Sequence, residues 1–264
     1  MRTLLKQLRD RAVGAIYADD YDRLIRFNAI PRPNYAYILW IAADLAKRLG
    51  IPAISALEFG VAGGNGLVAM QAHADRIAAI TGISIRVFGF DTGVGLPPPK
   101  DYRDLPYVWQ ESQFRMDEAA LRKRLGKAEL ILGDVRQTLA GFAETHQPPP
   151  VGAISFDLDY YSSTVAAFGV FGIPAAFRLP RILCYFDDIL STNLGHVGPA
   201  VGVPLAIEEY RRAHPRHALD PLTHLEFAYP PARRWHRQIY SFGDFDHPRF
   251  NDFIYGVDRQ LPLA

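Results

Sequence analysis

Cysteine is nearly absent from this sequence, because its 264 residues include only Cys184. A single cysteine excludes an internal disulfide and a metal site built from several thiolates. Long apolar runs are also missing, since no stretch reaches the ~18 consecutive apolar residues that a membrane-spanning helix needs. The first residues, MRTLLKQLRDR, lack the continuous apolar segment of a signal peptide. We therefore expect a cytoplasmic protein without a membrane partner.

The sequence also lacks an excess of charge of one sign. It has 29 Lys and Arg against 28 Asp and Glu, so the formal net charge is +1. Without a basic excess or a basic run, the sequence gives no electrostatic argument for binding a phosphate backbone, and we expect no nucleic-acid partner. The hydrophobic share of 49% and the charged share of 22% are ordinary for a globular protein. The length suffices for one α/β domain with additions.

Glycines cluster in one stretch, which reads ISALEFGVAGGNGL over residues 54–67. An apolar run with Glu58 near its end breaks into a turn, and a helix is predicted over 67–80. The glycines of the turn are Gly60, Gly63, Gly64 and Gly66. A buried strand, a glycine turn and a helix N-terminus form a mononucleotide-binding unit, in which the backbone comes close to the ligand. Glycine-rich turns also occur for purely structural reasons, so the turn alone leaves both interpretations open.

Strand and helix patterns alternate along most of the chain. Strands are predicted at 54–59, 83–91, 129–132, 151–159 and 181–186, and helices at 67–80, 117–125, 135–145, 163–177 and 204–214. This alternation predicts a mostly parallel, doubly wound Rossmann-like sheet with helices on both faces. The segments 225–229 and 237–242 are candidates for an antiparallel edge.

Helical patterns also precede the first strand. Residues 2–26 predict one or two amphipathic helices, and residues 35–49 predict another that ends at Gly50. We expect residues 1–50 to form a helical cap, which covers the domain or contacts a second copy in a homo-oligomer. Residues 51–264 are expected to form the main domain.

Carboxylates gather at the predicted strand ends, where ligands bind in such sheets. They are Glu58, Asp91, Asp134, Asp157, Asp159, Asp187 and Asp188. One carboxylate at a strand end is commonplace, whereas seven across five successive strands predict a site. After the second strand, residues 93–116 combine three consecutive prolines with four aromatic residues. This composition fits a flap over the site or a loop packed on its own aromatics.

The glycine turn is compatible with more than one nucleotide. Residues 64–69, GNGLVA, satisfy the GxGxxA pattern of nicotinamide cofactor sites. The match begins four residues past Gly60, where the strand should already have turned, and Glu58 stands where a dinucleotide fold usually has an apolar residue. A carboxylate at that position suits a ligand with a positive group, such as the amino group of a methionine moiety. Asp91 suits ribose hydroxyls in both kinds of site.

Four motifs in register resemble one known family. The segments EFGVAGGNG, FGFDTGVGLP, FDLDYYSST and FDD are similar in order and spacing to the macrocin O-methyltransferase group of S-adenosylmethionine-dependent enzymes. The resemblance covers about residues 54–212. It departs from the family before the fifth strand, where a Gly-Gly pair is replaced by AAFRLPRILCY, and at Ile189, where the family has an aromatic residue. These departures put the family's acceptor class, sugar hydroxyls on a secondary metabolite, in doubt.

The resemblance implies a class I methyltransferase fold and assigns roles to the strand-end residues. Glu58, Gly60 and Gly64 would surround the methionine portion of S-adenosylmethionine, and Asp91 would bind its ribose. Gly133 and Asp134 would lie beside the adenine, and Asp157 is assigned to the same cofactor site. Asp159, Asp187 and Asp188 would hold a divalent cation, expected to be Mg²⁺. The acceptor would be a small molecule with a hydroxyl group.

The chemistry of the aspartates agrees with a cation. Carboxylates that converge at neighbouring strand ends repel one another unless a cation neutralises them or some are protonated. With oxygen ligands and no clustered Cys or His, Mg²⁺, Mn²⁺ or Ca²⁺ fits better than zinc. Such a metal lowers the pKa of a bound hydroxyl. The alternative for Asp187 and Asp188 is a pair that caps a helix or loop.

The catalytic assignment rests on Asp159 and on a histidine. His196 and His247 are candidates for the general base by their placement in the chain, and we choose His196. Two other functions stay open. Asp157-Leu158-Asp159 is a DxD motif that suits a metal-dependent nucleotide-sugar glycosyltransferase, although that enzyme would not need the glycine turn or Glu58. A non-catalytic binding or scaffold protein is the third alternative.

Overall fold

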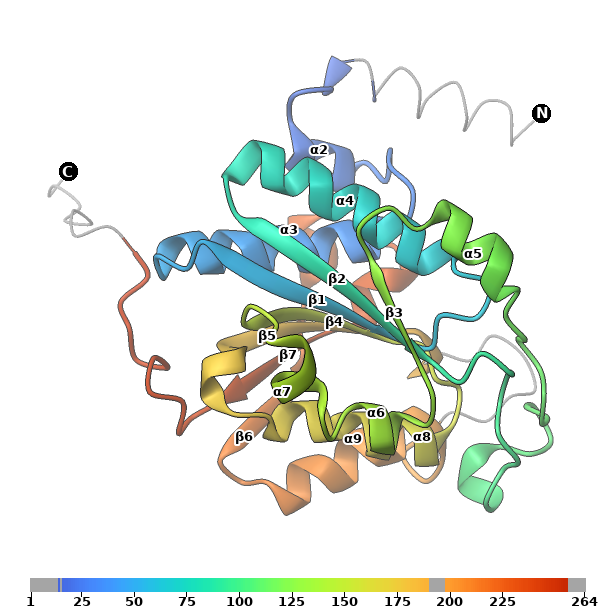
Figure 1. The fold of residues 1–264 in the computed structure, drawn as a ribbon. Helices are drawn as coiled ribbons and strands as arrows, with labels where there is room; N and C mark the ends of the chain where they lie inside the picture. The colour runs from blue at the N-terminus through green and yellow to red at the C-terminus, as the bar shows by residue number, and fades with distance from the viewer. Residues whose placement is uncertain (1–13, 15, 190–197, 256–264) are drawn as a thin grey trace, which may run out of the picture.

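The computed structural model describes residue 14 and residues 16–189 and 198–255. Its centre is a seven-stranded sheet in the order β3-β2-β1-β4-β5-β7-β6 (Figure 1). The strands are β1 (Ala53–Phe59), β2 (Ser84–Asp91), β3 (Glu129–Leu132), β4 (Val151–Phe156), β5 (Arg178–Phe186), β6 (His217–Pro221) and β7 (Ile239–Asp244). All neighbouring pairs from β3 to β5 are parallel, and β7 runs antiparallel to both β5 and β6. The predicted doubly wound sheet with an antiparallel edge is confirmed.

Helices cover both faces of the sheet, as Figure 1 shows. They are α2 (Tyr21–Arg26), α3 (Pro33–Arg48), α4 (Asn65–Thr81), α5 (Glu118–Arg124), α6 (Val135–Thr138), α7 (Phe142–His146), α8 (Tyr161–Ala167), α9 (Gly202–Ala213) and α10 (Leu225–Ala228). α3 and α4 pack on one face, and α6 to α9 lie on the other. Among the described residues, no helix is both long and apolar enough to cross a membrane.

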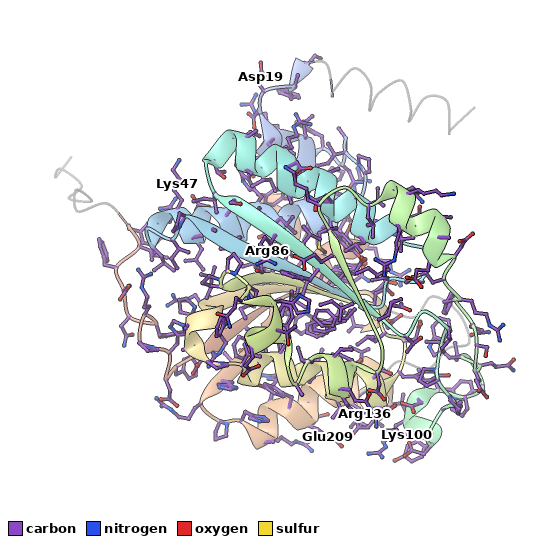
Figure 2. All side chains as sticks on the ribbon, viewed as in Figure 1. Asp19, Lys47, Arg86, Lys100, Arg136 and Glu209 are labelled. Atoms are coloured by element: carbon purple, nitrogen blue, oxygen red, sulfur yellow. The ribbon has the colours of Figure 1, made fainter. Side chains whose placement is uncertain are left out.

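The two faces of the sheet carry separate hydrophobic clusters. Successive side chains of a strand point to opposite faces. In β1, Ile54 and Ala56 therefore pack with α3 and α4, whereas Leu57 and Phe59 pack with the cluster of α7, α8 and α9. Side chains fill the space on both sides of the sheet (Figure 2). Burial on both faces explains why the central strands read as apolar runs in the sequence.

The N-terminal helix α3 contacts the sheet directly. Eleven residues of α3 are buried, and this helix packs against β1, β4 and β5 as well as α4. α2 packs on α3 in turn. The division into a cap over 1–50 and a domain over 51–264 stays a prediction, and residues 1–13 lie outside the described part. In space, α3 belongs to the layer that covers one face of the sheet.

Three sequence predictions about secondary structure are wrong. The segment 225–229, predicted as a strand, contains the helix α10, because Leu225 and Tyr229 are buried at helical spacing while Phe227 is 77% exposed. The strand beside β7 is His217–Pro221 instead. The predicted helix 135–145 is split, with Gly141 at the N-cap of α7. The predicted helix 163–177 ends at Ala167, and short 3₁₀ turns follow where glycine and proline weaken the α-helix.

The register of the sheet places the candidate residues at one edge. Phe59 is paired with Phe90 on one side and with Phe156 on the other, and Phe156 is paired with Phe186. The residues that follow each strand therefore leave the sheet at the same level. The sheet changes its direction of growth between β1 and β4, which is where doubly wound folds bind ligands.

Candidate functional site

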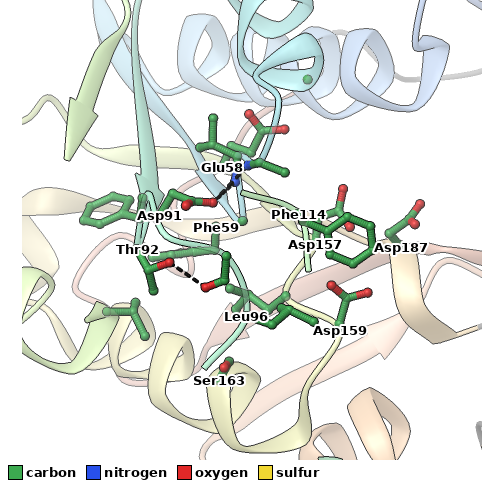
Figure 3. Close-up of a pocket in the computed structure, with 18 of the residues that line it drawn as sticks. Glu58, Phe59, Asp91, Thr92, Leu96, Phe114, Asp157, Asp159, Ser163 and Asp187 are labelled. Carbon is green, nitrogen blue, oxygen red and sulfur yellow. Dashed lines mark hydrogen bonds between the residues drawn. The ribbon is translucent and has the colours of Figure 1, made fainter. Parts of the chain in front are cut away.

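A cavity of about 360 Å³ opens at the carboxyl ends of the parallel strands (Figure 3). All ten strand-end residues predicted for the cofactor and the metal line it, namely Glu58, Gly60, Gly64, Asp91, Gly133, Asp134, Asp157, Asp159, Asp187 and Asp188. Proximity brings these residues into one site, while their individual roles stay predictions. His196, the predicted base, lies outside the described residues.

The glycine turn lets the chain pass close to β4 and to Glu58. Gly60 has φ +86°, and a Cβ added there would lie 1.7 Å from the carbonyl oxygen of Asp157. A Cβ on Gly66 would lie 1.9 Å from Oε1 of Glu58. Gly63 is different, because nothing lies within 4 Å of an added Cβ and its φ is not positive. Two of the glycines are therefore required by packing on neighbouring atoms.

Glu58 is a buried carboxylate with one oxygen left unpaired. Its side chain is 1% exposed, and Oε1 accepts a 2.6 Å hydrogen bond from the hydroxyl of Tyr35 on α3. Ser155 donates to the same hydroxyl at 3.0 Å, which fixes the orientation of the Tyr35 hydroxyl. Oε2 is buried without a partner. Burial raises the pKa of Glu58 to about 8, although the hydrogen bond from Tyr35 opposes the rise. The site can therefore receive a cationic group at Oε2.

Asp91 holds the glycine turn in shape. Its Oδ2 accepts backbone N–H bonds from Val61 at 2.8 Å and Ala62 at 2.9 Å, and its Oδ1 accepts one from Gly93 at 2.6 Å. The bond that crosses from the turn to Asp91 is drawn in Figure 3. A carboxylate offers about four lone-pair positions, so three backbone bonds leave roughly one for a ligand. Asp91 is thus a structural group of the turn as well as a lining residue.

The third strand contributes a compact turn to the cavity wall. Gly133 has φ +141° and donates its N–H to the carbonyl of Asp91 at 2.9 Å. Asp134 caps α6 by accepting from the backbone N–H of Arg136 at 2.9 Å, and it forms an ion pair with the same residue at 3.2 Å. The predicted adenine neighbours therefore form a short turn in which the side chain of Asp134 already makes local contacts.

Three carboxylates converge next to Glu58's strand. Asp157, Asp187 and Asp188 each offer an oxygen, and these oxygens lie within 4.8 Å of one another. The resemblance assigned Asp159 to this set instead of Asp157. Asp159 also lines the cavity, but its backbone N–H is what contacts Asp188, at 3.0 Å from Oδ2. Geometry therefore favours Asp157, Asp187 and Asp188 as the group that could hold a cation.

Burial and mutual repulsion both favour the protonated form of the aspartates at this site. Burial, and then the charges of Asp188 and Asp187, raise the pKa of Asp157 well above its usual value. Burial and the charges of Asp159 and Asp187 do the same for Asp188. Burial and the neighbouring aspartates raise the pKa of Asp159 to about 7. A divalent cation would relieve this repulsion, and an all-oxygen donor set is what Mg²⁺ or Ca²⁺ prefers.

The proline-rich loop after β2 lies over the cavity. Gly95, Leu96, Pro97, Trp109 and Phe114 all line it. The rings of Trp109 and Phe114 meet edge to face, with centroids 5.8 Å apart. Two of the aromatics that suggested a flap therefore face the site.

A buried aspartate anchors this loop to α8. Asp104 is fully buried and accepts from the backbone N–H of Ser162 at 2.8 Å and from its hydroxyl at 2.9 Å. Asp104 also accepts from the backbone N–H of Lys100 at 2.8 Å. The loop is thus held at the site by hydrogen bonds that no local sequence pattern predicts.

Other candidates from the sequence lie elsewhere. His247 is buried against the start of β5, where its Nε2 lies 3.1 Å from the carbonyl oxygens of Ala175 and Arg178. That is the opposite end of the sheet from the cavity, so placement in the chain was misleading for His247. Cys184, the single cysteine, is buried in the core strand β5. Conversely, Arg32 lines the cavity and no sequence pattern pointed to it.

Comparison with known proteins adds information on the fold. No protein-family model and no curated protein matches the chain in sequence. Its structure is similar to that of CalS11, a calicheamicin methyltransferase, with a TM-score of 0.54, 19% identity and 90% of each chain covered. The chain has a methyltransferase fold. The O-methyltransferase NovP is similar with a TM-score of 0.53, 14% identity and 80% of each chain covered. At these identities the likeness concerns the fold, and the chemistry has to be argued from the site.

Proposed function

We propose that this protein is an S-adenosylmethionine-dependent methyltransferase that acts on a hydroxyl group of a small molecule with the help of a divalent cation. The observation that carries the proposal is the unpaired, buried Oε2 of Glu58, a residue that lines the cavity. A cationic partner stabilises the ionised form of a buried carboxyl group, and the methionine end of the cofactor has an ammonium group. A nicotinamide dinucleotide has no aliphatic ammonium to offer.

The other lining residues fit the rest of the cofactor. Gly60 and Gly64 line the cavity beside the turn. Asp91 would accept a ribose hydroxyl with its remaining lone pair. Gly133 and Asp134 would lie beside the adenine. The cofactor supplies a methyl group on a sulfonium centre, which is transferred to a nucleophile in line with it. Alignment of that nucleophile contributes up to roughly 7–11 kcal/mol in well-oriented model reactions.

The acceptor side of the site is proposed to contain the carboxylates and the loop. Asp157, Asp187 and Asp188 would hold the cation, which would lower the pKa of the bound hydroxyl. Asp159 is the candidate group to accept the proton, because it lines the cavity beside them. Trp109 and Phe114 offer ring faces for an acceptor. The resemblance to macrocin O-methyltransferases favours a sugar or another secondary-metabolite hydroxyl, and the name of the O-methyltransferase NovP agrees with a hydroxyl acceptor.

Thermal unfolding with a panel of nucleotides tests the proposal. S-adenosylmethionine or S-adenosylhomocysteine should raise the melting temperature, because a ligand at 100 times its dissociation constant stabilises a protein by about 2.7 kcal/mol. For a chain of this size each kcal/mol corresponds to a shift of about 2–4 °C. NAD and UDP-sugars should give no shift. A shift with UDP-sugars alone would replace the methyltransferase by the glycosyltransferase alternative.

A second prediction concerns the cation. Mg²⁺ should raise the melting temperature, and Asp187→Asn or Asp157→Asn should remove this increase because each deletes an anionic ligand of the converging group. Asp246→Asn, at an exposed aspartate paired with Arg216, is the matched control and should keep it. Asp159→Asn should reduce the Mg²⁺ effect less than Asp157→Asn. The reverse order would return Asp159 to the ligand set that the resemblance implied.

A further inference from the structure

The end of the cavity that contains Glu58 also contains a positive charge. We propose that Arg32 binds the carboxylate of the amino acid end of the cofactor while Glu58 binds its ammonium, so that the pair forms a subsite for a zwitterion. Tyr35 is the positioning residue of this subsite. The inference rests on the proposed function and adds Arg32 and Tyr35 to it.

Arg32 is placed to reach a ligand. It immediately precedes α3, lines the cavity and is exposed at its rim. Its side chain does not cap the helix. Among the described residues, its guanidinium stacks over the ring of Tyr35, with Cζ 5.2 Å from the ring centroid, and it pairs with no carboxylate. The donors of the guanidinium therefore remain available for a carboxylate, which they match in a bidentate manner.

The position of Arg32 is unfavourable for the helix alone. The N-terminus of a helix carries a partial positive charge, so a cation there is destabilising and an anion is stabilising. The first turn of α3 has no acidic residue to compensate. The backbone of Arg32 also lies in the left-handed region, with φ +42°, and this conformation is costly for a residue with a side chain. A bound carboxylate would be attracted by both the guanidinium and the helix N-terminus.

Tyr35 connects the two charged groups. Its ring lies under the guanidinium of Arg32, and its hydroxyl donates to Oε1 of Glu58 at 2.6 Å. The ring is fully buried and contacts Tyr185 edge to face at 5.8 Å, so it cannot move freely. The hydrogen bond from Tyr35 therefore occupies Oε1 of Glu58 and leaves Oε2 free. One residue sets the geometry of both halves of the subsite.

The pair of charges is complementary to an α-amino acid group and to few other ligands. A ligand with only an ammonium would leave Arg32 unpaired, and a ligand with only a carboxylate would leave the buried Oε2 of Glu58 unpaired. A zwitterion satisfies both. Burial raises the pKa of Glu58, and the hydrogen bond from Tyr35 and then the positive charge of Arg32 oppose this rise. Arg32 acts in the same sense on the buried carboxyl group of Asp157.

Calorimetric titrations of the full chain with three ligands distinguish the contribution of Arg32 to binding from that of Glu58. S-adenosylhomocysteine has both groups, its decarboxylated analogue keeps only the ammonium, and 5′-methylthioadenosine has neither. Arg32→Gln should lower the affinity for S-adenosylhomocysteine by about 10- to 100-fold, as expected for loss of a charged hydrogen bond. Its affinity for the decarboxylated analogue should stay within about twofold of the wild type. Arg32→Lys should recover part of the loss, and Arg212→Gln, at an exposed side chain of α9, is the control.

Several outcomes would overturn the inference. Equal weakening of all three ligands by Arg32→Gln would show that Arg32 supports the fold or the aspartate group rather than the carboxylate. Unchanged affinity for S-adenosylhomocysteine would exclude the contact. If none of the three ligands binds the wild type, the proposed function fails instead.

Tyr35→Phe tests positioning separately, because it deletes one hydroxyl and keeps the ring. It should lower the affinities for S-adenosylhomocysteine and the decarboxylated analogue by about tenfold, which is the cost of one hydrogen bond to a charged group. The affinity for 5′-methylthioadenosine should be unchanged, because this ligand does not reach Glu58. A purely structural role of the hydroxyl would lower all three affinities together and would contradict the assignment.

Discussion

Gly60→Ala is expected to destabilise the protein by at least about 3 kcal/mol, because an added methyl group has to overcome both a steric overlap and an unfavourable backbone conformation. The Cβ would lie 1.7 Å from the backbone carbonyl of Asp157, which cannot rotate away as a side chain could. Gly60 also has φ +86°, and its N–H bonds the carbonyl of Phe90 at 2.9 Å. Relief of the overlap would separate β1 from β4 at the cavity and displace Asp157.

Gly63→Ala is the matched control for this prediction. Gly63 lies in the same turn, but an added Cβ meets nothing within 4 Å and its φ is not positive. Its free energy of unfolding should stay within about 0.5 kcal/mol of the wild type. Urea unfolding of the three proteins in one buffer measures the difference. Equal stability of the two variants would mean that the turn adapts to a side chain at Gly60, and the packing argument for this glycine would fail.

The clustering of the strand-end residues was predictable, because a general rule of topology states where the strands of such a fold end. Once strands and helices alternate, the carboxyl ends of the parallel strands meet at one edge, and Glu58, Asp91 and Asp187 are brought together without knowledge of any contact. The glycine turn is also local, since its residues are consecutive. These features needed only a correct assignment of the five central strands.

What the sequence did not reveal depends on contacts between distant segments. Arg32 enters the cavity because α3 packs across the sheet, and no spacing in the sequence marks that arrangement. Asp104 is joined to Ser162 across 58 positions of the chain. The choice between Asp157 and Asp159 turned on a local detail: β4 ends at Phe156 and Asp159 adopts φ +60°, so the strand alternation stops before Asp159.

Glu58→Gln is expected to change stability and ligand binding in opposite directions. The pKa of Glu58 rises from 4.5 in the unfolded chain to about 8 in the folded one, chiefly through burial. Between these values the unfolded chain loses a proton that the folded protein keeps, so the stability of the ligand-free protein falls as pH rises from 4.5 to 8. At about 1.4 kcal/mol per pH unit, the total is on the order of 3–5 kcal/mol.

The glutamine variant lacks this ionisation, so its stability relative to the wild type should increase steadily between pH 5 and pH 8 and then level off. The amide can lose up to about 1–3 kcal/mol at every pH if its buried N–H groups stay unpaired, which is why the slope and not the absolute value is the measurement. Among the aspartates with a raised pKa, only Asp157 acts on the charge of Glu58, so the titration of the others cancels in the difference. A difference that does not vary with pH would mean that Glu58 is already ionised at neutral pH.

The same substitution should lower the affinity for the ligand. An amide cannot neutralise an ammonium group, so Glu58→Gln should weaken S-adenosylhomocysteine by roughly 100-fold or more, as for a buried charge left without its partner. In the wild type at pH 7, the ammonium should displace the proton of Glu58, and calorimetry in buffers of different ionisation enthalpy should detect the proton released. The variant should release about one proton fewer per ligand bound. A carboxylate that costs stability when the site is empty and is neutralised when the ligand arrives is what a binding group requires, whereas a structural carboxylate would already have its second partner within the protein.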